Sequence, residues 1–203
     1  MKLFFALASP FVRKVVVCAM ERGLDGRIER LPAAAHPINQ DGAIKQHNPT
    51  GKVPTLITDA GMAIYDSRVI CEYLDSLGAA PRLIPAEGER RWQALVLQSA
   101  ADEMLDAALL ARYEAVARPE ALRWADWSEG QKTKIATTVA TFSKGWIGYL
   151  EANLDIGTIA AACALGYLDF RFPEIDWRKG NDRLATWYAA FSERASMKAT
   201  VPG

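Results

Sequence analysis

The chain has little of what several classes of protein require. Its 203 residues carry 24 basic and 24 acidic side chains, so the formal net charge is zero. A nucleic-acid binder uses a basic excess to contact phosphates, and this chain has no such excess. The two histidines, His36 and His47, are too few and too isolated to predict a metal site. We therefore expect neither nucleic acid nor a metal ion as a partner.

Cysteine is also scarce. Cys18, Cys71 and Cys163 are odd in number and far apart, which excludes a disulfide framework and the paired spacing of zinc ligands. A reducing compartment, the cytoplasm, fits this composition best. All three cysteines fall on apolar faces of expected helices, so we interpret them as core residues.

Long apolar runs are missing as well. No segment approaches the roughly 20 apolar residues of a membrane-spanning helix, so we expect no membrane association. An apolar stretch near the N-terminus, residues 3–8, is closed by Pro10, Arg13 and Lys14. It is too short for the apolar part of a leader peptide, and we expect a first strand there instead.

The first 77 residues alternate between short apolar runs and helix-like segments. Expected strands are residues 3–7, 28–31, 55–58 and 62–65, and expected helices are residues 10–22 and 67–77, with a helical turn near 41–46. Asp59-Ala60-Gly61, between the last two strands, is a hairpin signal. The order β-α-β, hairpin, α predicts a mixed α+β domain over residues 1–77.

A linker at residues 78–87 follows, and beyond it the pattern is helical throughout. Pro81 and Pro85 forbid a continuous helix through the linker. Expected helices are residues 89–118, 128–154, 155–170 and 181–194. Ser128 with Gln131 predicts a capping box at the start of the second of these. Residues 88–203 should therefore form an all-α domain.

Three short motifs in the first domain carry chemistry. Residues 48–54 read Asn-Pro-Thr-Gly-Lys-Val-Pro and lead directly into a strand. Proline tolerates a cis bond, which would turn the chain and leave the backbone of Val53 open to an extended ligand. Asp66-Ser67 and Ser9-Pro10 each open a helix, where side-chain oxygens and N–H groups hold charged groups. Taken alone, Ser9 is better explained as a plain N-cap, whereas a structural turn or cap at Pro54 and at Asp66-Ser67 does not exclude a binding role.

Together, and in this order, these motifs resemble those of the cytosolic glutathione transferases. The similarity rests on residues 9–15 (SPFVRKV), 48–56 (NPTGKVPTL), 65–70 (YDSRVI) and 165–171 (LGYLDFR), and it spans nearly the whole chain. The chain looks most like bacterial members with a serine at the catalytic position. The resemblance implies a thioredoxin-like N-terminal domain, an all-helical C-terminal domain and a homodimer.

The resemblance also implies that glutathione is the co-substrate and that its thiol is activated, because the thiolate is the nucleophile. Ser9 matches the catalytic serine, whose hydroxyl donates to the thiolate. Val53 matches the position whose backbone pairs with the cysteinyl unit, and Pro54 matches the family's cis-proline. Asp66 and Ser67 match the pair that binds the γ-glutamyl end of the peptide.

Other assignments implied by the resemblance are less specific. Lys52 is a candidate to neutralise the glycyl carboxylate, although a solvated lysine explains it nearly as well. Phe11, beside the glutathione residues, would also line a site for a hydrophobic electrophile between the domains. Arg112 and Tyr113 are candidates for the same site, since their expected helix would border it.

The function favoured by the resemblance is that of a glutathione S-transferase, which conjugates the thiolate to an electrophilic small molecule, as in detoxification. A non-catalytic glutathione-binding or regulatory protein of the same fold is one alternative. A glutathione-dependent peroxidase or lyase is another, because it would use the same glutathione site. Disulfide exchange is disfavoured, since relatives with that activity carry cysteine where Ser9 stands.

One motif of the second half departs from the family pattern. The family usually has Ser/Thr-x-x-Asp at the start of its core helix, whereas this chain reads Asp155-Ile-Gly-Thr158. Asp155 is still expected to cap the helix, because aspartate is a strong N-cap residue.

Overall fold

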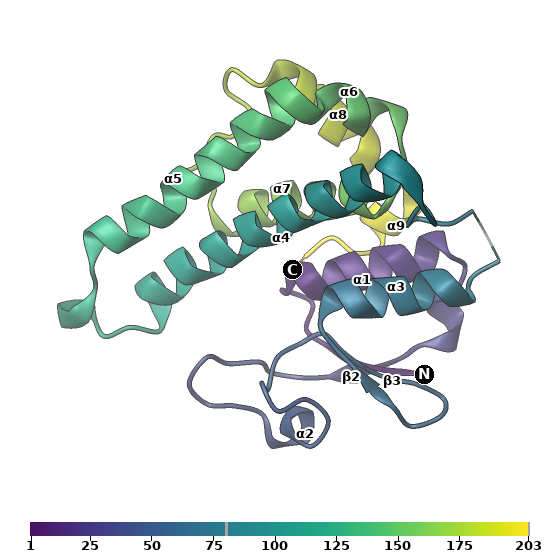
Figure 1. Ribbon diagram of the computed structural model, residues 1–203. Coiled ribbons are helices and arrows are strands. Elements are labelled where there is room, and N and C mark those ends of the chain that lie inside the picture. The colour runs from purple at the N-terminus through teal and green to yellow at the C-terminus, as the bar shows by residue number, and fades with distance from the viewer. Residues whose placement is uncertain (80, 203) are drawn as a thin grey trace. The chain divides into compact units, whose positions relative to one another are not determined.

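The computed structural model describes residues 1–79 and 81–202, and residue 80 of the predicted linker and residue 203 lie outside the described part. The chain forms two compact units, Met1–Arg91 with Ala195–Gly203, and Trp92–Arg194. The sequence pattern assigns the segment from Ala195 to the helical domain, but it groups with the first unit instead. The expected fold class, a mixed α/β domain followed by a helical one, is confirmed (Figure 1).

A four-stranded sheet in the order β2-β1-β3-β4 forms the base of the first unit. Its strands are β1 (Lys2–Phe5), β2 (Glu29–Pro32), β3 (Thr55–Ile57) and β4 (Ala63–Ile64). β1 and β2 are parallel and joined by α1 (Pro10–Glu21), whereas β3 is antiparallel to both β1 and β4. The expected strands and the hairpin are therefore confirmed, with ends shifted by one or two residues.

Two helices, α1 and α3 (Ser67–Leu77), pack against each other on one face of this sheet (Figure 1). The core between them and the sheet is apolar and fully buried, with Leu3, Val15, Leu56, Ile70 and Leu74 at 0% exposed. The 3₁₀ turn η1 (Asp25–Arg27) and the short helix α2 (Gly42–Lys45) lie in the connections. Cys18 and Cys71 are buried in this unit and Cys163 in the other, as expected.

A buried ion pair joins the C-terminal ends of α1 and α3. The Nε of Arg22 lies 3.2 Å from Oδ1 of Asp75, and the two side chains are only 1% and 2% exposed. Arg22 also donates through Nη2 to the carbonyl oxygens of Asp75 and Gly78. A Cβ at Gly78 would lie 2.7 Å from the Arg22 Nε, so this close approach requires glycine.

The same carboxylate fixes the middle of the linker. Asp75 accepts hydrogen bonds from the backbone N–H of Leu83 at 2.7 Å and of Ile84 at 3.3 Å. Because every oxygen of this buried group has a donor, the desolvation cost of the charge is offset locally.

The second unit is helical throughout. Its helices are α4 (Gly88–Val116, entering from the first unit), the 3₁₀ turn η2 (Glu120–Leu122), α5 (Ala125–Thr141), the π-helical stretch η3 (Phe142–Trp146), α6 (Ile147–Ala152), α7 (Ile156–Arg171) and α8 (Asp182–Ser192). None of the described helices is long and apolar enough to cross a membrane. Asp155 caps α7 as expected, because its Oδ1 accepts from the Thr158 N–H while the Thr158 hydroxyl accepts from the Asp155 N–H.

The expected start of α5 at Ser128 is wrong. The helix begins at Ala125, and the N–H of Ser128 already bonds to the carbonyl of Trp124. The N–H of Trp124 donates to Glu114 Oε1 on α4 at 2.8 Å. A carboxylate from another helix therefore fixes this helix start, in place of the local capping box that the sequence indicates.

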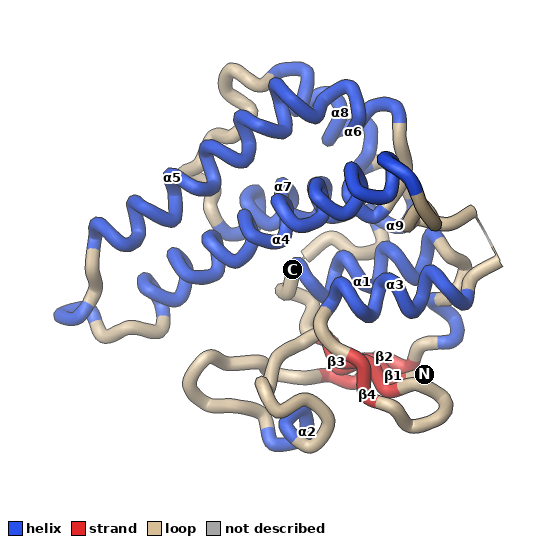
Figure 2. Tube along the Cα trace, viewed as in Figure 1, coloured by secondary structure: helices blue, strands red, loops and turns tan. Residues whose placement is uncertain are grey.

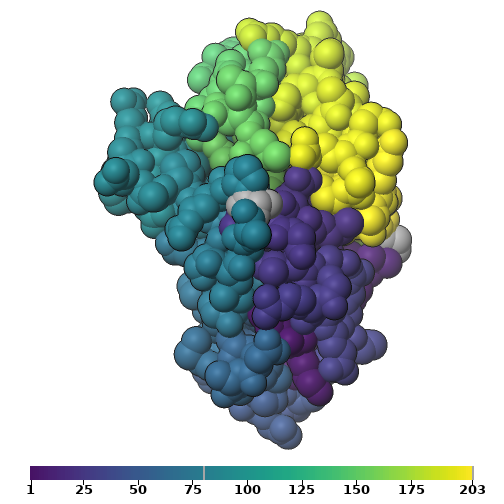
Figure 3. Space-filling view, turned by 90° about the vertical axis from the view of Figure 1, so that its right-hand side faces the viewer, coloured from purple at the N-terminus to yellow at the C-terminus, as the bar shows by residue number. Residues whose placement is uncertain are grey.

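The last short helix, α9 (Ala195–Lys198), returns to the first unit. Ser196 donates a hydrogen bond to Glu21 on α1, and the side chain of Arg13 bonds to the carbonyl of Met197 at 3.2 Å. Figure 3 shows the yellow end of the chain against the purple N-terminal residues. The C-terminus thereby supports the helix that carries Ser9.

We predict that Asp75→Ala lowers the free energy of unfolding by about 3–5 kcal/mol, because it leaves the Arg22 charge buried without its partner. Asp25→Ala is the matched control, since Asp25 pairs with Arg30 at 2.7 Å on the surface. An exposed pair contributes about 1 kcal/mol or less. Urea denaturation followed by circular dichroism measures both. Equal losses in the two variants would contradict the role given to the buried pair.

Candidate functional site

The sheet topology brings the three motifs of the first unit to one edge. β1 and β4 run in the same direction and β3 runs against them, with Phe4 opposite Thr55 and Leu56 opposite Ile64. The segment after β1, the segment before β3 and the segment after β4 therefore meet at the same edge of the sheet (Figure 2). Ser9, Val53 and Ser67 lie in these three segments.

Ser9 is the N-cap of α1. Its backbone is extended, with φ −84° and ψ 120°, and its Oγ accepts a hydrogen bond from the Val12 N–H at 3.3 Å. The hydroxyl has one donor of its own, and within the described chain nothing accepts from it. Ser9 can therefore donate to an anion placed at the start of the helix, where the helix dipole also favours negative charge.

Val53 precedes a cis peptide bond to Pro54, as expected for this motif. Among residues 1–79 and 81–202, none pairs with the backbone N–H or C=O of Val53. Most backbone polar groups of a folded protein are paired, so this open pair of groups is a ready edge for an extended peptide.

Asn48 holds the loop that presents Val53. Its Nδ2 donates to the Lys52 carbonyl at 3.2 Å and to the Thr55 hydroxyl at 2.9 Å, and its Oδ1 accepts from the N–H of Thr50 at 3.0 Å. The side chain is buried within its own loop. Sequence reasoning missed this positioning role, although asparagine at the head of a turn was an available signal.

Gly51, in the same loop, requires glycine. Its φ is +64°, a left-handed conformation that other residues rarely adopt. A Cβ there would also approach the side chain of Gln40 to 3.3 Å. Asn48 and Gly51 therefore both fix the loop before Val53.

Asp66 and Ser67 open α3. Asp66 is exposed and caps the helix, its Oδ1 accepting from the Arg68 N–H at 2.9 Å. The peptide bond before it, from Tyr65, is also cis. Ser67 is 2% exposed, yet within the described part of the chain its hydroxyl has no hydrogen-bond partner. A hydroxyl at a helix N-terminus, beside the N–H groups of the first turn, suits a carboxylate ligand.

Lys52 and Phe11 flank these groups in sequence. Lys52 is exposed, and none of the described carboxylates pairs with it. Phe11 is half-buried in the first turn of α1, with the Lys14 Nζ 5.9 Å from its ring centre. Both positions leave the side chains accessible, and their roles toward glutathione stay predictions.

Arg112 and Tyr113 belong to the helical unit, on α4, where both are half-buried. They interact electrostatically with Tyr167 of α7, and Arg112 also with Arg171 of the same helix; sequence reasoning assigned neither α7 residue a role. Burial raises the pKa of Tyr167, while the charges of Arg112 and Arg171 lower it. Burial first, and then the charge of Arg112, lowers the pKa of Arg171.

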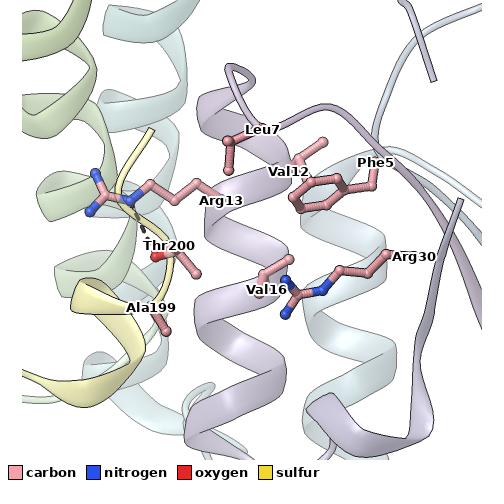
Figure 4. A pocket seen from close by; sticks show the side chains of 8 residues that line it. All are labelled: Phe5, Leu7, Val12, Arg13, Val16, Arg30, Ala199 and Thr200. Atoms are coloured by element: carbon pink, nitrogen blue, oxygen red, sulfur yellow. Dashed lines mark hydrogen bonds between the residues drawn. The ribbon is translucent and has the colours of Figure 1, made fainter. Parts of the chain in front are cut away.

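A small hollow beside α1 is a different feature (Figure 4). Its lining comes from α1, β1, β2 and the C-terminal segment: Phe5, Leu7, Val12, Arg13, Val16, Arg30, Ala199 and Thr200. At about 20 Å³ it has room for a water molecule but for no organic ligand. Arg13, which donates to the Thr200 hydroxyl at 3.3 Å, has a structural role there.

Within the described residues, no group of three or more His, Cys, Asp or Glu side chains lies close enough together to hold a metal ion.

Two family models match the chain. The model for the N-terminal domain of glutathione S-transferase matches residues 8–77, and the model for its C-terminal domain matches residues 125–190. Over its full length the chain is 33% identical to the uncharacterized GST-like protein YibF of Escherichia coli (strain K12), covering 98% of that protein.

Solved structures of similar proteins agree with these matches. A glutathione transferase family member from Pseudomonas fluorescens Pf-5, with bound glutathione, is 43% identical with a TM-score of 0.98, and the match covers 100% of this chain and 98% of that one. A further structure from the same organism, with bound S-(propanoic acid)-glutathione, is 41% identical with a TM-score of 0.93, and both chains are covered in full.

We predict that Asn48→Ala lowers the free energy of unfolding by about 1–3 kcal/mol, since it removes the side-chain hydrogen bonds to the Thr50 N–H, the Lys52 carbonyl and the buried Thr55 hydroxyl. Asn39→Ala, an exposed asparagine from the preceding loop, is the control and should change little. Urea denaturation gives the stability, and hydrogen exchange at Thr50 should be faster in the first variant. Unchanged exchange at Thr50 would contradict the proposed loop network.

Proposed function

Because the chain belongs to the glutathione S-transferase family, we propose that it binds glutathione at the sheet edge of the first unit and conjugates it to an electrophilic small molecule. Relatives at 43% and 41% identity hold glutathione or a glutathione thioether, and a thioether is the type of product that conjugation forms. The proposed enzyme is a serine-type transferase, with Ser9 at the catalytic position.

The observation that carries this proposal is the unused hydroxyl donor of Ser9 at the start of α1. A glutathione thiol is mostly protonated at neutral pH, and a donor together with the helix dipole stabilises the thiolate form. The thiol proton leaves to solvent. The sulfur then attacks an electrophilic carbon, a C–S bond forms, and either a leaving group departs or the product carbanion takes up a proton.

The remaining groups at the edge supply the binding. The open N–H and C=O of Val53 would pair with the cysteinyl unit as an added strand does, with cis-Pro54 setting the turn. Ser67 and the first N–H groups of α3 would hold the γ-glutamyl carboxylate, with Asp66 beside its ammonium. Lys52 and Phe11 would contact the glycyl end and the sulfur side of the peptide.

We further propose a cytoplasmic homodimer with a detoxifying role. Large apolar side chains on α4 support a partner surface, since Trp92 is 65% exposed and Val96 is 54% exposed. Three buried cysteines that form no disulfide fit a reducing compartment.

We predict that bound glutathione ionises about two pKa units below the free thiol, and that Ser9→Ala removes most of this shift. The thiolate absorbance of bound glutathione, titrated against pH, measures it. Ser76→Ala, at an exposed serine that bonds to the Tyr73 carbonyl, is the control and should keep the full shift. Binding without any shift in the native protein would favour the non-catalytic glutathione binder instead.

For Ser67→Ala, we expect the glutathione dissociation constant to rise about 10- to 100-fold, the size of a lost hydrogen bond to a charged group. The thiol pKa of whatever glutathione remains bound should be unaffected, because Ser67 acts on the far end of the peptide. Isothermal titration calorimetry gives the constant. Wild-type affinity in this variant would remove Ser67 from the proposed binding set.

A further inference from the structure

His36 holds a turn in the loop that connects β2 to α2. Its Nδ1 accepts hydrogen bonds from the backbone N–H of Ile38 at 3.2 Å and of Asn39 at 3.0 Å. Because both donors point at Nδ1, the neutral ring carries its proton on Nε2. The side chain is exposed, so protons of the solvent reach it. The turn therefore depends on one unprotonated nitrogen at the surface.

The other end of this loop is held by Asp41, the N-cap of α2. Its Oδ2 accepts from the Ala34 N–H at 3.5 Å, and its Oδ1 accepts from the Ala43 N–H at 2.8 Å. The titratable and charged side chains of the loop and the adjoining segments are those of Arg30, Asp41, Lys45, His47 and Lys52. Within the described part of the chain none of them bonds to His36. A change of charge on His36 therefore acts on the turn and breaks no ion pair.

The same loop packs on the segment that presents Val53. Gln40 follows Asn39 directly and lies against Gly51, since a Cβ on Gly51 would meet the Cβ of Gln40 at 3.3 Å and its Cγ at 3.4 Å. Gly51 is only two residues before Val53. A rearrangement of the turn at His36 would therefore change the packing of the loop that offers the backbone of Val53.

Protonation removes the acceptor on which the turn depends. The charge of an imidazole ordinarily changes between pH 5 and 8. In the protonated ring both nitrogens are donors, so an N–H at Nδ1 would face the N–H groups of Ile38 and Asn39. The two hydrogen bonds are thus present when the ring is neutral and are lost as the pH falls through its titration.

We propose that His36 is a positioning residue for the glutathione site, and that its protonation weakens glutathione binding by breaking the turn that packs on the Gly51 loop. This inference rests on the proposed binding of glutathione at the sheet edge. His36 acts through Gln40 and Gly51, and the bound peptide becomes sensitive to pH at a distance from its thiol.

S-Methylglutathione is the probe, because it has no thiol whose own ionisation would make binding depend on pH. Calorimetry gives its dissociation constant at about pH 7.5 and about pH 5.5, on either side of the usual imidazole titration. For the native protein the constant should be about 3- to 10-fold higher at the lower pH, the size of one lost hydrogen bond.

Two substitutions of His36 separate the acceptor from the ring. Asparagine carries an acceptor oxygen that bonds to backbone N–H groups two residues on, and it does not titrate in this range. His36→Asn should therefore bind within about twofold of the native value at both pH values. His36→Ala has no acceptor, so its constant should be raised about 3- to 10-fold at both.

His47→Asn is the matched control, because His47 is the other histidine of the chain. Its ring lies beside Phe4, with 5.7 Å between the ring centres. This variant should keep the native difference between the two pH values. Equal binding by the native protein at both pH values would overturn the proposal. A His36→Asn variant that keeps the difference, or a His47→Asn variant that loses it, would overturn it too.

Failure of glutathione binding is separable from failure of the turn. If S-methylglutathione does not bind to the native protein at about pH 7.5, the proposed glutathione site falls. Amide chemical shifts measured by NMR then decide on the turn and its link. The N–H signals of Ile38, Asn39 and Gly51 should titrate together with the His36 ring, and in His36→Asn they should not. A Gly51 signal that does not follow His36 would overturn the link between the two loops.

Discussion

The buried pair of Arg22 and Asp75 is the contact on which the geometry of the candidate glutathione site depends. It joins α1 and α3 at their C-terminal ends, while Ser9 and Ser67 lie at their N-terminal ends. A helix is a nearly rigid rod, so fixing one end of two packed helices limits how far the other ends separate. The charges are tolerated in the interior because backbone carbonyls of Asp75 and Gly78 accept from Arg22 and backbone N–H groups of Leu83 and Ile84 donate to Asp75.

In the candidate site, polar groups that have hydrogen-bond partners within the protein lie next to polar groups that have none. Asn48 uses its amide fully to hold the loop, whereas the backbone of Val53, presented by that loop, has no partner in the described chain. The start of α3 shows the same difference. Asp66 accepts a hydrogen bond from the Arg68 N–H, whereas the hydroxyl of the neighbouring Ser67 has no partner in the described chain. A polar group without a hydrogen-bond partner lowers the stability of the folded protein when it is shielded from water, and a ligand that pairs with it offsets that loss.

Sequence patterns predicted most of the fold because most helices and strands depend on residues that are close together in the sequence. The helix over 67–77 and the cap at Asp155 depend on periodicity and on residues three or four apart, and both are confirmed. The start of α5 depends on Glu114, ten residues before Trp124 and on another helix, so no local signal placed it.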